Sequence, residues 1–120
     1  MTDYTLGMVE SRFADIIWDN APMTTRELVE RCKAELNWKR TTTYTVLKKL
    51  GEQGFFRLEN GEVTALVTRE DYESAQSKKF IEEKFEGSLP AFLAAFTRNK
   101  ELSGAEIDEI QALIDNAKEG

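Results

Sequence analysis

The chain has 120 residues and a net charge of −6, from 22 acidic and 16 basic side chains, which fits one small domain or a domain with an oligomerisation arm and excludes two large domains. It contains no histidine, which excludes Ser-His-Asp and Cys-His catalysis, histidine-ligated zinc and a histidine pH switch within a single chain. Cys32 is its one cysteine, so an intrachain disulfide and a Cys-x-x-Cys metal site are excluded, in agreement with a reducing compartment.

Two amphipathic helices are predicted at the start of the chain. Apolar side chains recur at spacings of three and four over residues 7–20, and Asn20-Ala21-Pro22 ends that pattern. Thr24-Thr25-Arg26-Glu27 has the pattern of a capping box and predicts a second helix that runs to about Leu36. Cys32 lies on the apolar face of this helix, where we expect a small core residue rather than a redox sensor.

Residues 40–53 predict a third helix, although the threonines within them are poor helix formers. Gly54 can adopt the left-handed conformation that ends a helix. Helical spacing assigns its apolar side to Thr43, Val46, Leu47 and Leu50. The other side carries Thr41, Thr42, Tyr44, Thr45, Lys48 and Lys49, with no carboxylate before Glu52.

Positive charge is concentrated around this third helix. Residues 26–49 hold 7 basic and 3 acidic side chains, a net charge of +4, whereas residues 71–120 have a net charge of −5. A basic stripe on an acidic protein indicates a confined anionic partner. The alternative is an ordinary solvated helix face.

A β-hairpin is predicted next, because two strand-like segments, residues 55–59 and 62–67, flank Asn60-Gly61. Both residues of this pair tolerate a positive φ, as a type I′ turn requires. Three helices followed by a hairpin is the order of a winged helix-turn-helix, in which the third helix enters the DNA major groove. The predicted fold class is therefore mainly α with a small β-hairpin (α+β), with the winged-helix domain over residues 1–70.

Residues 71–120 are predicted to add a helical dimerisation region. Capping patterns at Thr68 and Ser103, and Pro90 in a first helical turn, indicate three amphipathic helices. Three short helices cannot cover three apolar stripes by themselves, so we expect pairing with a second copy; the alternative is packing onto the N-terminal domain. The residues expected at the dimer surface are Tyr72, Ile81, Phe85, Leu89, Phe92, Leu93, Phe96, Ile107, Ile110, Leu113 and Ile114.

The region of the third helix also resembles a known family. Trp38-Lys39-Arg40-Thr41-Thr42-Thr43-Tyr44-Thr45-Val46-Leu47-Lys48-Lys49-Leu50, followed by Gly54-Phe55, is similar to the W-x-x-x-T-[VI]-x-T-L-[LI]-x-[RK]-L…K-G signature of the penicillinase repressor family. This family includes the BlaI and MecI repressors of β-lactam resistance and the CopY copper-transport repressors. The beginning and the end of the family pattern are also matched, by Glu10 with Ile16-Ile17-Trp18 and by Leu102-Ser103 with Glu106-Ile107. The resemblance therefore spans nearly the whole chain.

The resemblance implies a homodimeric bacterial repressor with a winged-helix head that binds palindromic operator DNA. It implies that Thr41, Thr42 and Tyr44 read bases and that Thr45, Lys49, Thr25 and Arg26 contact phosphates. Threonine methyls and hydroxyls suit base edges, whereas Lys48, Lys49 and Arg57 suit phosphates. Lys39 and Arg40 complete the expected DNA-binding set. The alternative for the threonine run is local capping of the helix start; Trp18 and Trp38 are expected to pack rather than to stack on bases.

The sequence departs from the family at several positions. Tyr44 stands where the resistance repressors have a basic residue, so we expect a different operator sequence. Glu59 and Glu62 lie near the turn of a short hairpin, so little phosphate contact is expected from the wing. Relatives are released by proteolysis or by metal exchange, but Ala95-Phe96 replaces the Asn-Phe cleavage site of the methicillin repressor and no Cys-x-Cys pair is present. The regulatory protease or sensor is therefore not identified.

Other classes of protein fit the residues less well. No apolar stretch approaches the roughly 18 residues of a membrane span, and acidic residues at 3, 10 and 15 do not suit a signal peptide, so we expect a cytoplasmic protein without a membrane partner. Phosphate-binding glycine motifs are absent, and we expect no cofactor and no metal. The sequence offers no nucleophile paired with a general base, so nothing in it indicates an enzyme. The remaining rival is a winged-helix protein-interaction module without specific DNA binding.

Overall fold

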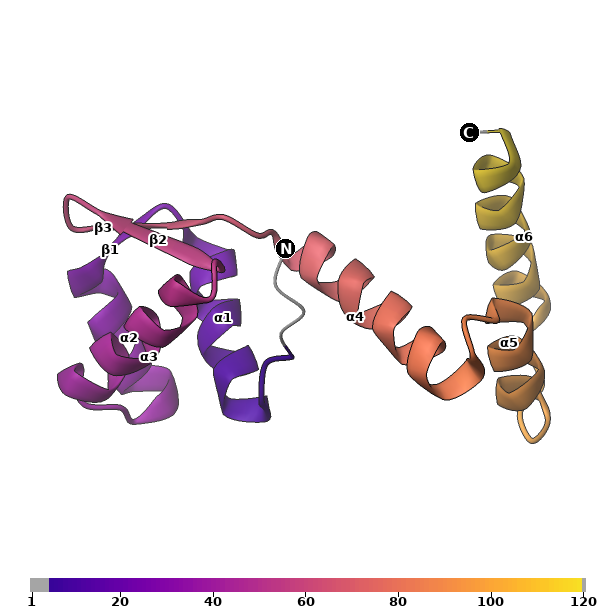
Figure 1. Ribbon diagram of the computed structural model, residues 1–120, viewed down its shortest axis with the longest axis horizontal. Coiled ribbons are helices and arrows are strands. Elements are labelled where there is room, and N and C mark those ends of the chain that lie inside the picture. Colours follow the sequence, from indigo (N-terminus) through magenta and orange to yellow (C-terminus); the bar gives the residue numbers. More distant parts are fainter. Residues whose placement is uncertain (1–4, 120) are drawn as a thin grey trace. The chain divides into compact units, whose positions relative to one another are not determined.

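The computed structural model describes residues 5–119 and divides them into two compact units (Figure 1). Residues 5–77 form the first, called the head, and residues 78–119 form the second, called the C-terminal unit. Along the chain the elements are α1 (Met8–Asn20), β1 (Met23–Thr24), α2 (Thr25–Leu36), α3 (Arg40–Glu52), β2 (Phe56–Glu59), β3 (Glu62–Ala65), α4 (Arg69–Phe85), α5 (Leu89–Thr97) and α6 (Gly104–Glu119). The predicted fold class is confirmed.

The first two helices begin and end as their sequence predicts. The Gly7 N–H donates to Glu10 Oε1 at 3.1 Å, which satisfies one of the free donors at the start of α1. The capping box of α2 is present: the Glu27 N–H donates to Thr24 Oγ1 at 3.1 Å, and Glu27 in turn accepts from the Thr24 N–H. Asn37 ends α2 in the left-handed conformation, with a φ of 57°.

The predicted third helix is also confirmed. α3 separates its two faces as helical spacing requires, since Thr43, Leu47 and Leu50 are buried while Thr41, Thr42, Thr45 and Lys48 are exposed. The buried Thr43 hydroxyl donates to the Lys39 carbonyl oxygen at 3.2 Å, so its polar atom has a partner in the core. Gly54 follows the helix with a φ of +88°, a conformation that a side chain would oppose.

A small antiparallel sheet lies beside the three helices, with the strand order β1-β3-β2. The predicted hairpin is confirmed: Glu59 pairs with Glu62 across a two-residue turn, in which Asn60 and Gly61 both have positive φ. The short strand β1 was not predicted. It places Met23 opposite Val63 and completes the sheet.

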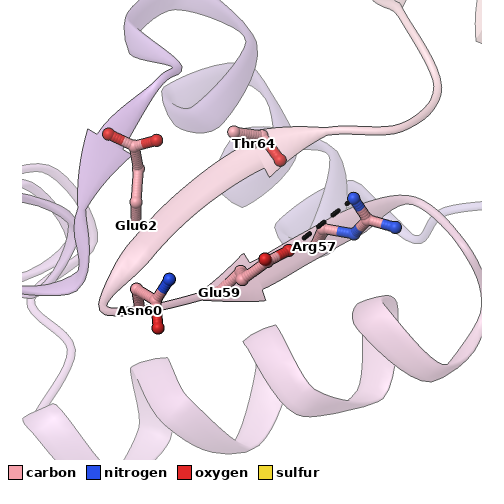
Figure 2. Close-up of a pocket in the computed structure, with 5 residues that line it drawn as sticks. All are labelled: Arg57, Glu59, Asn60, Glu62 and Thr64. Carbon is pink, nitrogen blue, oxygen red and sulfur yellow. Dashed lines mark ion pairs between the residues drawn. The ribbon is translucent and has the colours of Figure 1, made fainter.

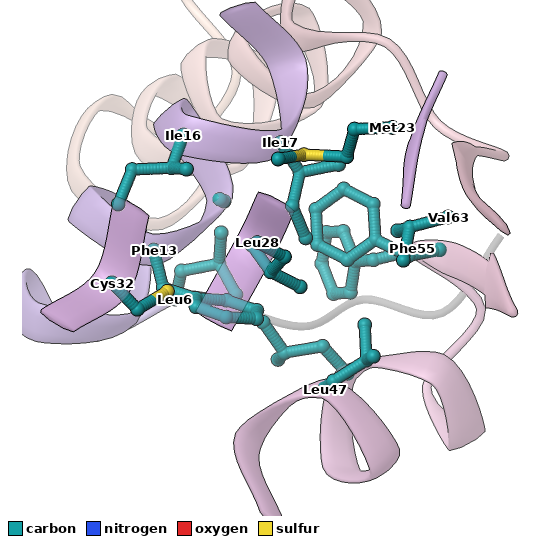
Figure 3. Packing of buried hydrophobic residues seen from close by; sticks show 13 residues of the cluster. Leu6, Phe13, Ile16, Ile17, Met23, Leu28, Cys32, Leu47, Phe55 and Val63 are labelled. Carbon is teal, nitrogen blue, oxygen red and sulfur yellow. The ribbon is translucent and has the colours of Figure 1, made fainter. Parts of the chain in front are cut away.

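The core of the head is formed by apolar side chains from α1, α2, α3 and the hairpin (Figure 3). Phe13, Ile17, Leu28, Leu50 and Val63 have no exposed surface. Burial of one such side chain contributes roughly 1.5–3 kcal/mol to folding. These contacts fix α3 against α1 and α2, and therefore determine which of its residues face outward.

Cys32 and the two tryptophans occupy the packing positions predicted for them. Cys32 is buried, and its burial raises the pKa of the thiol from 9.0 to about 11. Trp38 stacks on Phe13 with ring centroids 5.5 Å apart. The Trp18 Nε1–H donates to the Val67 carbonyl oxygen at 2.8 Å. These partners are in the protein, which agrees with a packing role.

The C-terminal unit contains α5, α6 and the second half of α4. Positive φ angles at Glu86 and Gly87 end α4. The Ser88 hydroxyl accepts from the Ala91 N–H at 3.1 Å and caps α5, and Ser103 and Glu106 cap α6 in the same way. The predicted capping positions at Ser103 and near Pro90 are thus confirmed.

The two units divide after Ser77, later than the predicted boundary at residue 70. The reason is that the first turns of α4 pack in the head. Tyr72 accepts a hydrogen bond at its hydroxyl from the Leu6 N–H at 2.8 Å, and its ring lies 5.8 Å from that of Phe55. Tyr72, which the sequence assigns to the dimer surface, thus packs its ring in the head.

Candidate nucleic-acid interface

The exposed face of α3 forms the centre of the candidate interface. Thr41, Thr42 and Thr45 are exposed on this helix, and no acidic residue lies in its first turn. No described residue accepts from the backbone N–H groups of residues 40–42, because the first bond of the helix runs from the Thr43 N–H to the Lys39 carbonyl oxygen. Such a helix start attracts negative charge. The face is therefore suited to an anionic partner.

The threonine hydroxyls on this face are not equivalent. Thr45 Oγ1 donates to the Thr41 carbonyl oxygen at 2.8 Å, so this hydroxyl offers an outside partner only an acceptor while that bond persists. Thr41 and Thr42 have no side-chain hydrogen bond among the residues that the structure describes. Their hydroxyls can therefore both donate and accept, as contacts with varied base edges require.

Tyr44 connects the exposed face of α3 with the hairpin. The Arg40 guanidinium lies over its ring at 5.3 Å from the centroid, a distance that fits a cation–π contact. Tyr44 also lines a groove of about 630 Å³ between α3 and β2, whose other walls include Lys48, Arg57 and Leu58. The groove thus brings together three of the predicted DNA-binding residues.

Lys48 and Lys49 have different surroundings although they are neighbours. Lys49 Nζ lies 2.7 Å from Glu10 Oε2, and the Glu10 side chain is only 19% exposed. Lys48 is exposed and forms no ion pair among the described residues. The sequence did not reveal the Glu10 partner, because the two residues lie on different helices and no spacing rule relates them.

The start of α2 contributes two further predicted residues. The Thr25 N–H donates to the Gly61 carbonyl oxygen at 3.0 Å, which ties this helix start to the turn of the hairpin. Arg26 is almost fully exposed and lies 3.8 Å from Glu30, itself exposed, so the pair holds its guanidinium weakly. Arg26 is therefore accessible to a partner.

The tip of the hairpin is acidic. Figure 2 shows Arg57 beside Glu59, and Glu62 and Thr64 on the neighbouring strand. Arg57 Nη1 lies 3.7 Å from Glu59 Oε2. Glu59 and Glu62 are paired directly across the strands, where like charges repel each other. This arrangement agrees with the expectation that the wing adds little binding to phosphates.

The C-terminal unit carries the other predicted surface. None of the described residues of α4, α5 and α6 is buried. Phe85 and Phe92 meet with ring centroids 5.6 Å apart, and Phe80 and Phe96 extend this aromatic cluster. Large apolar side chains remain close to half exposed or more; they are Phe80, Leu89, Phe96, Ile107, Leu113 and Ile114.

Residues 5–119 contain neither a candidate metal site nor a candidate membrane-spanning helix. Their His, Cys, Asp and Glu side chains form no group of three that could hold a metal ion. Among these same residues, no helix has the length and apolar character needed to cross a membrane.

Comparisons with known proteins confirm the family resemblance. The chain matches the penicillinase repressor family over residues 6–116. It is 24% identical over 115 residues to the methicillin resistance regulatory protein MecI of Staphylococcus aureus, which covers 92% of this chain and 94% of that protein. MecI of Mammaliicoccus sciuri gives the same identity and coverage. The penicillinase repressor of Bacillus licheniformis is 26% identical over 107 residues, 86% of this chain and 84% of that protein.

These relatives are named as regulators and not as enzymes. Because the family match covers nearly all of the residues, the chain belongs to the penicillinase repressor family of transcriptional repressors.

Proposed function

We propose that this repressor binds palindromic operator DNA as a homodimer, with α3 of each copy in the major groove. The observation that carries the proposal is the exposed face of α3, where threonines and basic residues occur with no carboxylate before Glu52. The helix start is free of acidic residues, which would repel the phosphate backbone. Such a protein acts in the cytoplasm, where its operator DNA is.

Base recognition is assigned to the first turns of α3. Thr41 and Thr42 have the unbonded hydroxyls described above, and their methyl groups suit the methyl of thymine. Tyr44 adds a ring and a hydroxyl where the resistance repressors have a basic residue, so the operator is expected to differ from theirs. These three residues set the sequence preference in this proposal.

Phosphate contacts are assigned to residues around this helix. Arg40 and Lys48 extend from α3, and Lys39 from the position just before it. Thr45 gives up its helix bond when it donates to a phosphate. Thr25 and Arg26 contribute from the start of α2, and Arg57 from the wing after it leaves Glu59. The net charge of −6 repels DNA over long distances, but salt screens this repulsion. Binding is therefore determined by the close contacts of these residues with phosphates. Lys49 belongs to this set only if it leaves Glu10.

The homodimer is assigned to the apolar residues of the C-terminal unit. A second copy covers side chains that a single chain leaves exposed. The proposed surface is formed by Ile81, Phe85, Leu89, Phe92, Leu93, Phe96, Ile107, Ile110, Leu113 and Ile114. A two-fold dimer binds half-sites about one helical turn, or a multiple of it, apart.

Recovery of bound fragments tests this function. The purified protein is incubated with fragmented DNA from its source organism at about physiological salt, and the bound fragments are sequenced. Enrichment of one or a few inverted repeats near promoters supports the proposal. Recovery that matches the input DNA contradicts it and favours the protein-interaction module, which the acidic C-terminal residues 71–120 would suit.

A further inference from the structure

A second polar cluster lies in the head, away from the candidate interface, where α4 begins. Arg69 Nη2 lies 2.7 Å from Asp19 Oδ1 and 3.2 Å from Asp15 Oδ1, and both carboxylates belong to α1. The guanidinium also lies 5.7 Å from the centroid of the Trp18 ring. One side chain of α4 thus contacts three residues of α1.

The position of the two carboxylates suggests why they are present. Asp19 lies at the C-terminal end of α1, where the helix dipole disfavours a negative charge, and no basic residue lies in that last turn. Asp15 lies one turn earlier, so the two like charges also repel each other. The guanidinium of Arg69 compensates both effects, because its planar fork can bond two carboxylates at once.

Two further contacts follow at helical spacing along α4. The Tyr72 hydroxyl accepts from the Leu6 N–H, and its ring lies 5.7 Å from Trp18. Gln76 Oε1 accepts from Thr5 Oγ1 at 3.0 Å. Arg69, Tyr72 and Gln76 therefore form one stripe that holds the first two turns of α4 on the head.

We infer that Arg69 is a positioning residue: it fixes the start of α4 on the head and thereby restricts which half-site separations one dimer can bind. The inference rests on the proposed function, because half-sites matter only for a dimeric DNA-binding protein. The ion pairs of Arg69 with Asp15 and Asp19 are partly exposed and contribute little to the stability of the head. They act instead on the direction in which α4 leaves the head, because they hold its first turn against α1.

Hydrogen exchange tests the first step without DNA. In Arg69→Ala, the amides of residues 73–77 are expected to exchange about threefold faster, while those of α2 and α3 keep their protection. Lys78→Ala removes a positive charge from an exposed position on the same helix and serves as the matched control. Unchanged exchange over residues 73–77, or faster exchange throughout the head, would overturn the inference.

DNA binding tests the second step, with inverted repeats whose centre-to-centre separation varies by one base pair at a time. The wild-type protein and Lys78→Ala are expected to prefer one separation sharply. Arg69→Ala and the double variant Asp15→Asn/Asp19→Asn are expected to bind the best separation about tenfold more weakly and to discriminate less among the others. Affinity for a single half-site is expected to stay unchanged.

The outcomes separate the two proposals. An unchanged separation profile in Arg69→Ala, or an equal loss on single half-sites, overturns the positioning role. If the wild-type protein binds no inverted repeat of any separation, the proposed function itself fails, and with it the role in operator spacing. The exchange measurement then still decides whether Arg69 holds α4.

Discussion

Lys48 and Lys49 show how two adjacent residues on one helix can have separate tasks. Lys49 is held by Glu10, which lies at the start of α1 and is mostly buried. Removing Lys49 breaks this ion pair, whereas removing Lys48 breaks no ion pair of the described residues. We therefore expect Lys48 to act on DNA affinity and Lys49 mainly on the stability of the head.

The two alanine variants test this division. Lys48→Ala should weaken binding to all DNA sequences and lower the slope of log affinity against log salt by about 1. Lys49→Ala should leave that slope unchanged and lower the free energy of unfolding by about 1 kcal/mol or less, since the pair is partly exposed. Salt titrations and urea unfolding measure the two effects. An equal loss of slope in both variants would show that Lys49 leaves Glu10 and binds phosphate.

The ionisation of Cys32 is expected to lower the stability of the head at alkaline pH. The buried thiol has its pKa raised to about 11, against 9.0 for an exposed cysteine. Below pH 9 the thiol is protonated in the folded and the unfolded protein, so its contribution is fully present. Between pH 9 and about 11 only the unfolded state ionises, so stability falls.

Urea unfolding at pH 8 and pH 10.5 measures this loss, with Cys32→Ala as the comparison. The variant lacks the thiol, so we expect its stability to fall less over the same interval, although other groups titrate in both proteins. In addition, the folded wild type should react slowly with a thiol reagent at pH 8 and rapidly when unfolded. Equal pH dependence in the two proteins contradicts this account of the thiol.

At the scale of elements, α6 offers a direct test of the dimer surface. Ile114 is 49% exposed and Ala112 is exposed as well, but residues two positions apart lie on opposite sides of a helix. Ile114→Glu places a carboxylate in the proposed apolar interface, whereas Ala112→Glu places the same group on the other side. Sedimentation should show mostly 13.7 kDa monomer for Ile114→Glu and dimer for both Ala112→Glu and the wild type. Equal dimerisation of both variants contradicts the proposed surface.

The elements of this chain were predictable where local patterns determine them. The capping box at Thr24 and the Asn60-Gly61 turn act within a few residues, and both are present. β1 was missed because a two-residue strand has no pattern of its own; it forms only when Met23 meets Val63, far along the chain. Helix patterns in the sequence are therefore enough to locate the candidate interface. Pairings between residues far apart in the sequence, such as Met23 with Val63, are seen only in the structure.

Tyr72 illustrates the same limit for the apolar stripes. Helical spacing identifies which residues of α4 share a face, but it does not say what covers that face. In the structure Tyr72 packs with Trp18 and Phe55 of the head, and the compact unit extends to Ser77. The two compact units divide within α4, because a helix can pass from one unit to the next without a break in its sequence pattern.

At the scale of the whole molecule, the basic residues of the candidate DNA interface and the apolar residues proposed for dimerisation lie in different units. Residues 26–49, with a net charge of +4, belong to the head. The exposed apolar side chains of α5 and α6 lie in the C-terminal unit. This division fits a dimeric repressor, because DNA contact and self-association then use separate surfaces.

The most direct test of the central claim is selection from random double-stranded DNA by the wild type and by Thr42→Ala in parallel. Ser74→Ala removes an exposed hydroxyl far from α3 in sequence and serves as the control. We expect the wild type and Ser74→Ala to select the same inverted repeat. Thr42→Ala should relax the preference at one position in each half-site, symmetrically, by about fivefold. If Thr42→Ala selects the same repeat with the same preference at every position, Thr42 does not read a base. If the wild type selects no repeat at all, the protein does not bind palindromic DNA through α3.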